Sequence, residues 1–485
     1  MCMKKVIACF TCAVALAACV DGFKDEAKWV SSTRNMTLAS PAKEQIIVRF
    51  SADGATQTIE WPVVPGAGGY LVSVFRDTAG SWVPVGEVDE TVDKPSVMRY
   101  ATEDTYYKVA VKTLGNANAN NKDAPTATEK EYNNLLSVYA KIPDYEDLKD
   151  YFEENPIPAD SAILCYELEA GGTYFMSASV ELPTFVVIRG ENKDNRASLS
   201  LSEGSFVNNG FGFRLQNVDV TIEATHSGNG AFILMSSTFD AGRAAQLSAA
   251  SNPYIVVPTS SPIAIQSCNI TGLKQSLFYD SNQRYAIGSF LIKDCVIERS
   301  TGVSSAELRF QAGAWKDITL TGSTFYATSA TASSPFFIQN SATTRVVNIL
   351  PTMETWSNGS ITITNCTFFQ VCKNGQSLNS NGVMRTSGDK VIALKNLFVD
   401  SFEGEAARRL NQYTAVFEGG FNSYWFNNAF PTGEVRDGNG NTSGRDNTGT
   451  YIDIDPELTY TGDGQFEVSS PIHKANGIGD LRWYK

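Results

Sequence analysis

The chain has 485 residues and a formal net charge of −13. A chain of this length is expected to form more than one domain. An excess of acidic groups repels nucleic acid and anionic membrane surfaces, so the composition argues against a nucleic-acid-binding protein and predicts no nucleic-acid partner.

Residues 1–18 have the pattern of a signal peptide. Lys4 and Lys5 precede an apolar run that is too short to cross a membrane as a helix. The following residues, 19–42, are polar and irregular, and we expect them to form a tether.

The residues around Cys19 resemble two export signals. Leu16-Ala17-Ala18-Cys19 resembles a bacterial lipobox, which implies that the chain is cut before Cys19 and that this cysteine is the site of lipid attachment. The acidic residues that follow resemble the surface-export signal of Bacteroidetes-type lipoproteins: Asp21, Asp25 and Glu26. The implied location is the outer membrane, with the protein facing the extracellular side and held by its lipid. The alternative is a plain secretory signal followed by an incidental cysteine.

Residues 43–141 contain short alternating runs separated by Gly and Pro, which predicts β-strands. An early Trp61, a central strand that begins at Tyr70 and a late Tyr-x-Val-x-Val strand from Tyr107 resemble fibronectin type III domains. The resemblance implies a β-sandwich that serves as a spacer, with Trp61 in its core.

Residues 142–159 are expected to form a linker with a short amphipathic helix. The helix is predicted from Asp144 to Glu154, and Asn155-Pro156 ends it. Such a helix could cover the open edge of the strands that follow.

An eight-residue pattern recurs between residues 213 and 399. Two apolar residues alternate, a polar residue marks a turn, a small residue follows, and one more apolar residue comes two places later. Period-two alternation indicates strands, and repetition of a short unit indicates stacked coils. Six copies begin at Phe213, Ile263, Phe290, Ile318, Ile361 and Ile392, and a seventh candidate begins at Phe232.

The repeat predicts a right-handed parallel β-helix over residues 160–485, and an ordinary β-sandwich is the alternative. In a β-helix, Cys268, Cys295 and Cys366 would fill one inward column as buried small residues rather than form disulfides or a zinc site. The turn position would be taken by residues that tolerate left-handed backbone geometry: Asn217, Asp294, Asn365 and Asn396.

The C-terminal run resembles the closing segment of pectate-lyase-like β-helix proteins, with Asp455-Pro456-Glu457-Leu458, Gly464-Gln465-Phe466 and Ser470-Pro471-Ile472. The expected fold is therefore all-β: a fibronectin type III-like sandwich, a capping helix and a parallel β-helix. Together with the lipobox, these parts resemble surface lipoproteins of glycan-utilisation systems. The resemblance implies polysaccharide as the ligand and outer-membrane glycan-uptake proteins as partners, and it supplies no catalytic residues.

Catalytic and metal-binding motifs are weak in this sequence. The two histidines, His226 and His473, are not accompanied by a nucleophile-elbow motif. The run from Asp437 to Asn441 looks like the start of a calcium loop, but Thr448 stands where an EF-hand requires Glu. We therefore expect no catalytic residue, metal or cofactor, and Ca²⁺ stays open as an alternative.

Aromatic residues carry the binding hypothesis, because sugars stack their C–H faces on exposed rings. The candidate glycan-binding residues are Trp315, Trp356, Tyr424 and Trp425. We expect a cell-surface lipoprotein that binds polysaccharide without cleaving it. The alternatives are a polysaccharide lyase or glycoside hydrolase of the β-helix type, and an adhesin or structural stalk.

Overall fold

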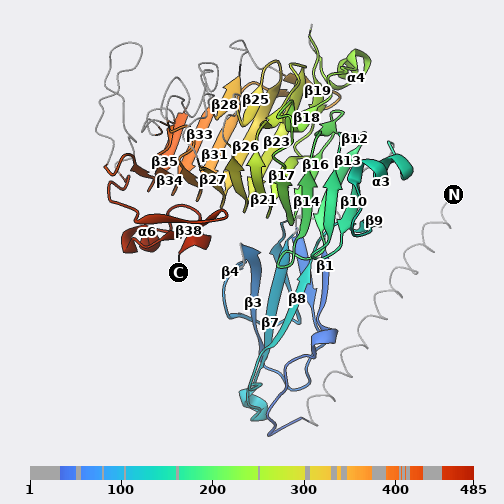
Figure 1. The fold of residues 1–485 in the computed structure, drawn as a ribbon. Coiled ribbons are helices and arrows are strands. Elements are labelled where there is room, and N and C mark those ends of the chain that lie inside the picture. Colours follow the sequence, from blue (N-terminus) through green and yellow to red (C-terminus); the bar gives the residue numbers. More distant parts are fainter. Residues whose placement is uncertain are drawn as a thin grey trace, which may run out of the picture. The chain divides into compact units, whose positions relative to one another are not determined.

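The computed structural model is all-β, with long parallel sheets (Figure 1). It describes residues 33–484 except 51–55, 79–80, 103–104, 160–162, 250–251, 301–305, 329–335, 340–346, 374–388, 403–405, 407–409, 411–415 and 430–449. The predicted signal peptide and Cys19 lie outside these residues. The chain divides into two compact units, residues 1–137 and residues 138–485.

The first unit contains two antiparallel sheets. One has the order β1-β2-β6, formed by β1 (Ile47–Phe50), β2 (Thr56–Glu60) and β6 (Ser96–Tyr100). The other has the order β4-β3-β7-β8 with β5 added to β3, formed by β3 (Gly69–Thr78), β4 (Ser81–Pro84), β5 (Glu90–Val92), β7 (Tyr106–Leu114) and β8 (Thr128–Asn133). Two short 3₁₀ helices accompany them, η1 (Lys43–Gln45) and η2 (Ala117–Ala119). Alternating side chains fill a core that includes Trp61, as predicted.

Both predicted limits of the first unit differ from the observed ones. The tether is shorter than expected, because Thr37 pairs with Lys122 and Leu38 is buried, so residues 33–42 are in part fixed to the first unit. At the other end, β9 (Val138–Ile142) pairs in parallel with a strand of the second unit. The predicted boundary after Lys141 therefore falls inside β9.

The second unit is built on three parallel sheets. The strands run through the sheets in a repeating order, and successive strands of each sheet lie side by side (Figure 1). The eleven-stranded sheet contains β9, β10 (Ile163–Leu168), β13 (Phe185–Gly190), β16 (Phe213–Gln216), β19 (Ile255–Val257), β20 (Ile263–Gln266), β23 (Tyr285–Lys293), β26 (Ala314–Thr321), β31 (Ser360–Thr364), β33 (Lys390–Leu394) and β35 (Val416–Gly420).

The other two parallel sheets are shorter. The nine-stranded sheet contains β11 (Thr173–Met176), β14 (Ala197–Leu201), β17 (Val218–Ile222), β21 (Asn269–Leu273), β24 (Val296–Arg299), β27 (Thr324–Ala327), β32 (Thr367–Phe369), β34 (Leu397–Val399) and β36 (Ser423–Trp425). The six-stranded sheet contains β12 (Val180–Leu182), β15 (Phe206–Asn208), β18 (Ala231–Met235), β22 (Ser276–Tyr279), β25 (Leu308–Phe310) and β28 (Phe337–Gln339).

The remaining elements lie outside the three sheets. They are the helices α3 (Leu148–Glu154), α4 (Ala241–Leu247) and α6 (Pro471–Asn476), the 3₁₀ helix η4 (Leu481–Trp483), and two hairpins, β29 (Val347–Ile349) with β30 (Glu354–Trp356) and β37 (Leu458–Gly462) with β38 (Gln465–Val468). Helix α3 begins at Leu148 rather than at the predicted Asp144, and it ends at the predicted Glu154. It contacts β11 and β12, which are the first strands of two sheets. Leu148 and Phe152 of α3 join the core of the second unit.

Five of the predicted repeat copies lie in register in the eleven-stranded sheet, where Phe213, Ile263, Phe290, Ile318 and Ile361 occupy one row. The turn residue of each copy has a positive φ, from 51° at Ser267 and Asn365 to 56° at Asn217. The Asn, Asp, Ser or Gly at this position therefore supplies the left-handed conformation that redirects the chain.

The sixth copy is shifted by one residue from the prediction. Ile361 pairs with Val391 rather than with Ile392, and Lys395 rather than Asn396 has the positive φ. Four consecutive apolar residues, 391–394, leave the alternation ambiguous, and a shift of one residue exchanges the two faces of a strand. The seventh candidate was wrong, because Phe232 lies in β18 of the six-stranded sheet.

The predicted cysteine column is confirmed. The residue after each position of the column is paired between neighbouring strands, in the order Asn269, Val296, Thr324 and Thr367. This register aligns Cys268 with Cys295, and Ser323 continues the column to Cys366. All three cysteine side chains are fully buried. Burial raises the pKa of Cys295 to about 12 and raises that of Cys268 and Cys366 as well, so these thiols stay protonated at neutral pH.

No helix within the described ranges is both long and apolar enough to cross a membrane.

Candidate functional site

The outer face of the nine-stranded sheet carries two rows of outward side chains. One row runs from Thr173 through Ser198, Asp219, Asn269, Val296, Thr324 and Thr367 to Leu397 and Ser423. The other runs from Phe175 through Ser200, Thr221 and Thr271 to Glu298, Tyr326, Phe369, Val399 and Trp425. The second row changes from mainly polar to mainly apolar along the stack, whereas the later part of the first row alternates between the apolar Val296 and Leu397 and hydroxyl residues.

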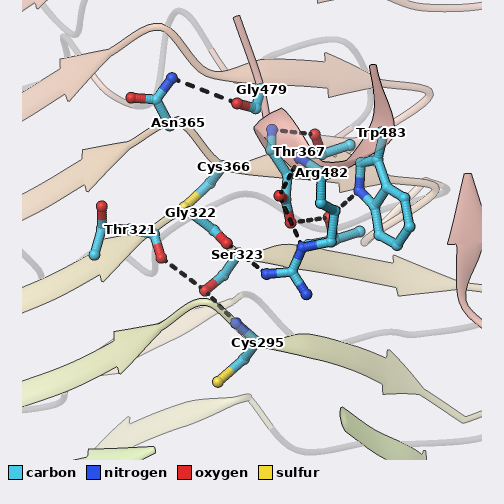
Figure 2. A network of polar contacts seen from close by, with 12 residues as sticks. Cys295, Thr321, Gly322, Ser323, Asn365, Cys366, Thr367, Gly479, Arg482 and Trp483 are labelled. Atoms are coloured by element: carbon cyan, nitrogen blue, oxygen red, sulfur yellow. Dashed lines mark hydrogen bonds and ion pairs between the residues drawn. The ribbon is translucent and has the colours of Figure 1, made fainter. Parts of the chain in front are cut away.

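The C-terminal segment, residues 455–484, covers the apolar half of this face. Phe466 of β38, Ile478 and Trp483 of η4 pack against Val296, Tyr326, Leu397 and Val399 in one buried cluster. The indole Nε1 of Trp483 donates a hydrogen bond of 2.7 Å to Thr324 Oγ1 (Figure 2). The apolar outward residues therefore form a second core rather than an exposed surface.

Polar contacts fix the C-terminal segment to the sheet turns (Figure 2). The Asp480 carboxylate accepts hydrogen bonds from Thr324 Oγ1 at 2.8 Å and from Arg482 Nε at 2.9 Å. Arg482 also donates to the backbone oxygen of Gly322 at 2.8 Å. Burial raises the pKa of Asp480 to about 6. Gly479 is required at this contact, because a Cβ there would lie 2.8 Å from Thr367 Oγ1 and its φ is +79°.

The polar half of the face is left open by this segment, and its side chains are half-buried or exposed. Asp219 Oδ1 accepts hydrogen bonds from Asn269 Nδ2 at 2.9 Å and from Arg196 Nη1 at 3.2 Å. Ser200 Oγ donates to Glu223 at 2.6 Å. These mutual contacts hold the polar groups in place before any ligand arrives, which lowers the entropy cost of binding.

Two exposed rings lie beside the first strand of the open half. Phe175 of β11 is 39% exposed and Tyr145 is 73% exposed. The Tyr145 amide donates to Thr173 O at 2.8 Å, which keeps this residue at the edge of β11. Tyr145 has a φ of +66°, a costly conformation for a bulky side chain. Backbone strain of this kind often accompanies binding sites.

The open half can bind a ligand through hydroxyl, amide and carboxylate groups. Neighbouring strands of a sheet lie about 4.7–4.9 Å apart, so the rows repeat their polar groups at that interval. The carboxylates of Glu223 and Glu298 disfavour an anionic ligand, and the charges of Asp219 and Arg196 offset each other in an ion pair. Among the described residues, no group of three or more His, Cys, Asp or Glu side chains could hold a metal ion. The calcium-like run from Asp437 to Asn441 lies outside them.

Three of the four aromatic residues predicted from the sequence are buried. Trp315 packs on Phe310 in the main core, and Trp356 of β30 lies in a smaller buried cluster with residues of β19, β23 and β26. Tyr424 points inward and stacks on Phe398 with a centroid distance of 5.4 Å. Because a buried ring cannot stack on a sugar, these three are unsuited to the predicted role in this structure. Trp425 is half-buried beside the C-terminal cluster.

Sequence reasoning missed Phe175, Tyr145 and the polar row. The residue that follows the small residue of each copy lies in the first row, but it gives no usable signal. This position is polar at Asp219 and Asn269 in the open half and also at Thr324 and Thr367 in the covered half.

Both histidines have structural contacts. His473 of α6 is fully buried between Ser423 Oγ and Ser470 Oγ, each 2.8 Å from a ring nitrogen. Burial lowers the pKa of His473 to about 4, so the ring is neutral at pH 7. His226 is also buried, with Nδ1 accepting from the Gly228 amide at 2.9 Å and Nε2 3.3 Å from Gly204 O.

Comparison with known proteins gives two family matches. Residues 2–171 match DUF4992 and residues 172–328 match DUF4957, each described as a domain of unknown function. No curated protein and no solved structure matches the chain. The open half of the face lies within the second matched region, and the C-terminal segment lies outside both.

Proposed function

We propose that this protein is a cell-surface lipoprotein that binds polysaccharide for a glycan-uptake system without cleaving it. The observation that carries the proposal is the open polar half of the nine-stranded sheet, flanked by Phe175 and Tyr145. A long, shallow, regularly spaced face of this kind suits a repeating neutral polymer better than a small compact ligand.

The proposed architecture is a fibronectin type III-like sandwich followed by a right-handed parallel β-helix. Support for the sandwich comes from its two antiparallel sheets and from Tyr107, whose hydroxyl donates to Thr102 O at 3.1 Å and accepts from Thr102 N at 2.6 Å. Such a tyrosine corner is typical of immunoglobulin-like domains. Support for the β-helix comes from the parallel sheets, whose strands recur in turn along the chain.

The proposed location is the extracellular side of the outer membrane, with the lipid on Cys19 as anchor. This part rests on the lipobox-like Leu16–Cys19 and on the acidic residues that follow it. Outer-membrane glycan-uptake proteins are the proposed partners, and the first unit would act as a spacer.

A glycan panel tests the proposal. The purified protein would be run by affinity electrophoresis in gels that contain neutral glucans, mannans, xylans, polygalacturonate or glycosaminoglycans. We expect retardation by at least one neutral glycan, and a Phe175→Ala variant that binds it about five- to tenfold more weakly, because one aromatic contact contributes on the order of 1 kcal/mol. Ile163→Ala is the matched control, because Ile163 is equally exposed (39%) but lies in β10 of another sheet.

The same panel separates the alternatives. New reducing ends or absorbance from unsaturated uronates after incubation would identify a hydrolase or a lyase and contradict the non-catalytic proposal. Absence of binding to every glycan would favour an adhesin or stalk.

A further inference from the structure

A second binding site is suggested by a hollow in the first unit. It has a volume of about 570 Å³, within the range of roughly 300–1,000 Å³ that is usual for small-molecule sites. Ile47 of β1, Glu60 of β2 and Ser96 of β6 form its floor, and Pro62 and Pro95 also line it. The site thus lies at one end of the outer face of the three-stranded sheet.

Strand register explains how these side chains meet. Ile47 pairs with Glu60, and Glu60 pairs with Ser96, so the three residues stand side by side across the sheet and point to the same face. Ile47 is 47% exposed and so offers its apolar side chain to the hollow. The opposite face of the sheet supplies the core through Ile59 and Val97.

The lining combines an apolar surface with a few polar groups. Ile47, Pro62 and Pro95 supply the apolar part. Glu60 supplies a carboxylate that is paired with Arg49, Ser96 a hydroxyl, and Gln45 an amide whose oxygen accepts from the Ala42 amide at 3.3 Å. The residues that line the hollow include no cation, so they do not favour an anionic ligand. The chemistry fits a neutral, amphiphilic ligand with several hydroxyl groups.

The site is also anchored on a rigid part of the unit. Trp61 lines the hollow, is only 4% exposed and packs edge-on against Tyr70 with a centroid distance of 5.3 Å. Because Trp61 is fixed in the core, the backbone of the adjacent Glu60 is held in place. A pre-formed site of this kind binds with little ordering cost.

We infer that this hollow binds one neutral sugar unit, which gives the first unit a carbohydrate site of its own in addition to its role as a spacer. The choice of a sugar as the ligand rests on the proposed function, whereas the hollow and its lining do not.

Ligand-observed saturation-transfer NMR on the full chain tests this inference, with methyl glycosides of glucose, galactose, mannose and xylose and with N-acetylglucosamine as probes. We expect at least one probe to bind with millimolar affinity. Ser96→Phe, which fills the hollow, should weaken that binding at least tenfold. Thr58→Phe is the matched control, because Thr58 lies on the same face of β2 but outside the hollow, and it should leave binding unchanged.

A second variant guards against a folding defect. Glu60→Gln keeps the size of the side chain, removes its charge, and should weaken binding several-fold while the circular dichroism spectrum stays unchanged. Absence of transfer to every probe, or equal binding by Ser96→Phe and the wild type, would overturn the inference.

The two proposals can fail independently. If polymer binding is lost in Phe175→Ala while Ser96→Phe leaves the binding of both polymer and probes unchanged, the proposed function stands and the sugar site does not. If the probes bind and Ser96→Phe abolishes this while no polymer is bound, the sugar site stands and the polysaccharide role of the sheet face does not.

Discussion

Asn396 shows how single residues fix the stack of coils. It occupies the position of Cys366 in the next coil, where its Oδ1 accepts from the Cys366 amide at 3.0 Å and its Nδ2 donates to Ile363 O at 2.7 Å. Asn422 repeats the arrangement one coil later and accepts from the Asn396 amide at 3.0 Å. The inward column thus contains cysteine side chains in its earlier part and the amide side chains of Asn396 and Asn422 at its end. Each of these two amides forms hydrogen bonds with backbone groups of the preceding coil.

Replacing Asn396 with Leu should therefore destabilise the protein by about 2–5 kcal/mol, because buried backbone groups would lose their partners. Urea unfolding followed by circular dichroism measures this change. Asn476→Ala is the control, since Asn476 is only part-buried at the end of α6, and it should change stability by less than about 0.5 kcal/mol. Equal effects of the two substitutions would contradict the structural role of the column.

The buried imidazole of His473 predicts a loss of stability in acid. Its pKa is about 4 in the folded protein and about 6.5 when unfolded, so the unfolded chain takes up the proton first. The contribution of the neutral ring to the free energy of unfolding is complete above pH 6.5. It falls by up to about 3 kcal/mol as the pH drops through 4. The pKa of Asp480 is raised by burial, so this carboxyl changes stability with pH in the opposite direction. The test therefore compares the pH dependence of stability between the wild type and His473→Asn, in which the Asp480 contribution is common to both. The stability difference between them should shrink between pH 6.5 and 4, and a constant difference would refute the assignment.

At the scale of elements, the alternation of the repeat predicts where strands lie, and the polar turn residue predicts where they end. The structure confirms both for the copies from Phe213 to Ile361. The sequence does not settle the register of β33, because 391–394 are all apolar. Nor could it identify the open face, since whether an outward row is exposed depends on the C-terminal segment, which packs on residues as distant along the chain as Val296.

The register of β33 leads to a direct test. The repeat predicts that Ile392 and Leu394 point inward and that Val391 points outward. In the structure Val391 is buried and Leu394 is 39% exposed. Val391→Asp should place a charge in the core and abolish soluble folded protein, or lower stability by more than about 4 kcal/mol. Leu394→Asp should fold normally. Soluble yield and the urea midpoint distinguish the two, and the opposite outcome would restore the register in which Ile392 and Leu394 point inward.

At the scale of the molecule, each unit offers a different kind of surface. The second unit presents a row of polar groups, for which we propose a polymer as ligand, and the first presents a hollow, for which we propose one sugar unit. Most of the aromatic residues that the sequence suggested for binding are buried inside the second unit, where their buried apolar surface stabilises the packed parallel sheets. Exposure, rather than residue type, therefore decides which rings can bind.

The net charge of −13 bears on which polymers the whole molecule can approach. Binding of a neutral glycan involves no release of counterions, so its affinity should change less than twofold between 0.05 and 0.5 M NaCl, a range over which surface charges become screened. Polygalacturonate should bind poorly at low salt because both partners are negative. Affinity electrophoresis at the two salt concentrations measures both. Strong binding of polygalacturonate at low salt that weakens as salt is added would show that a local basic surface, rather than the neutral polar row, governs recognition.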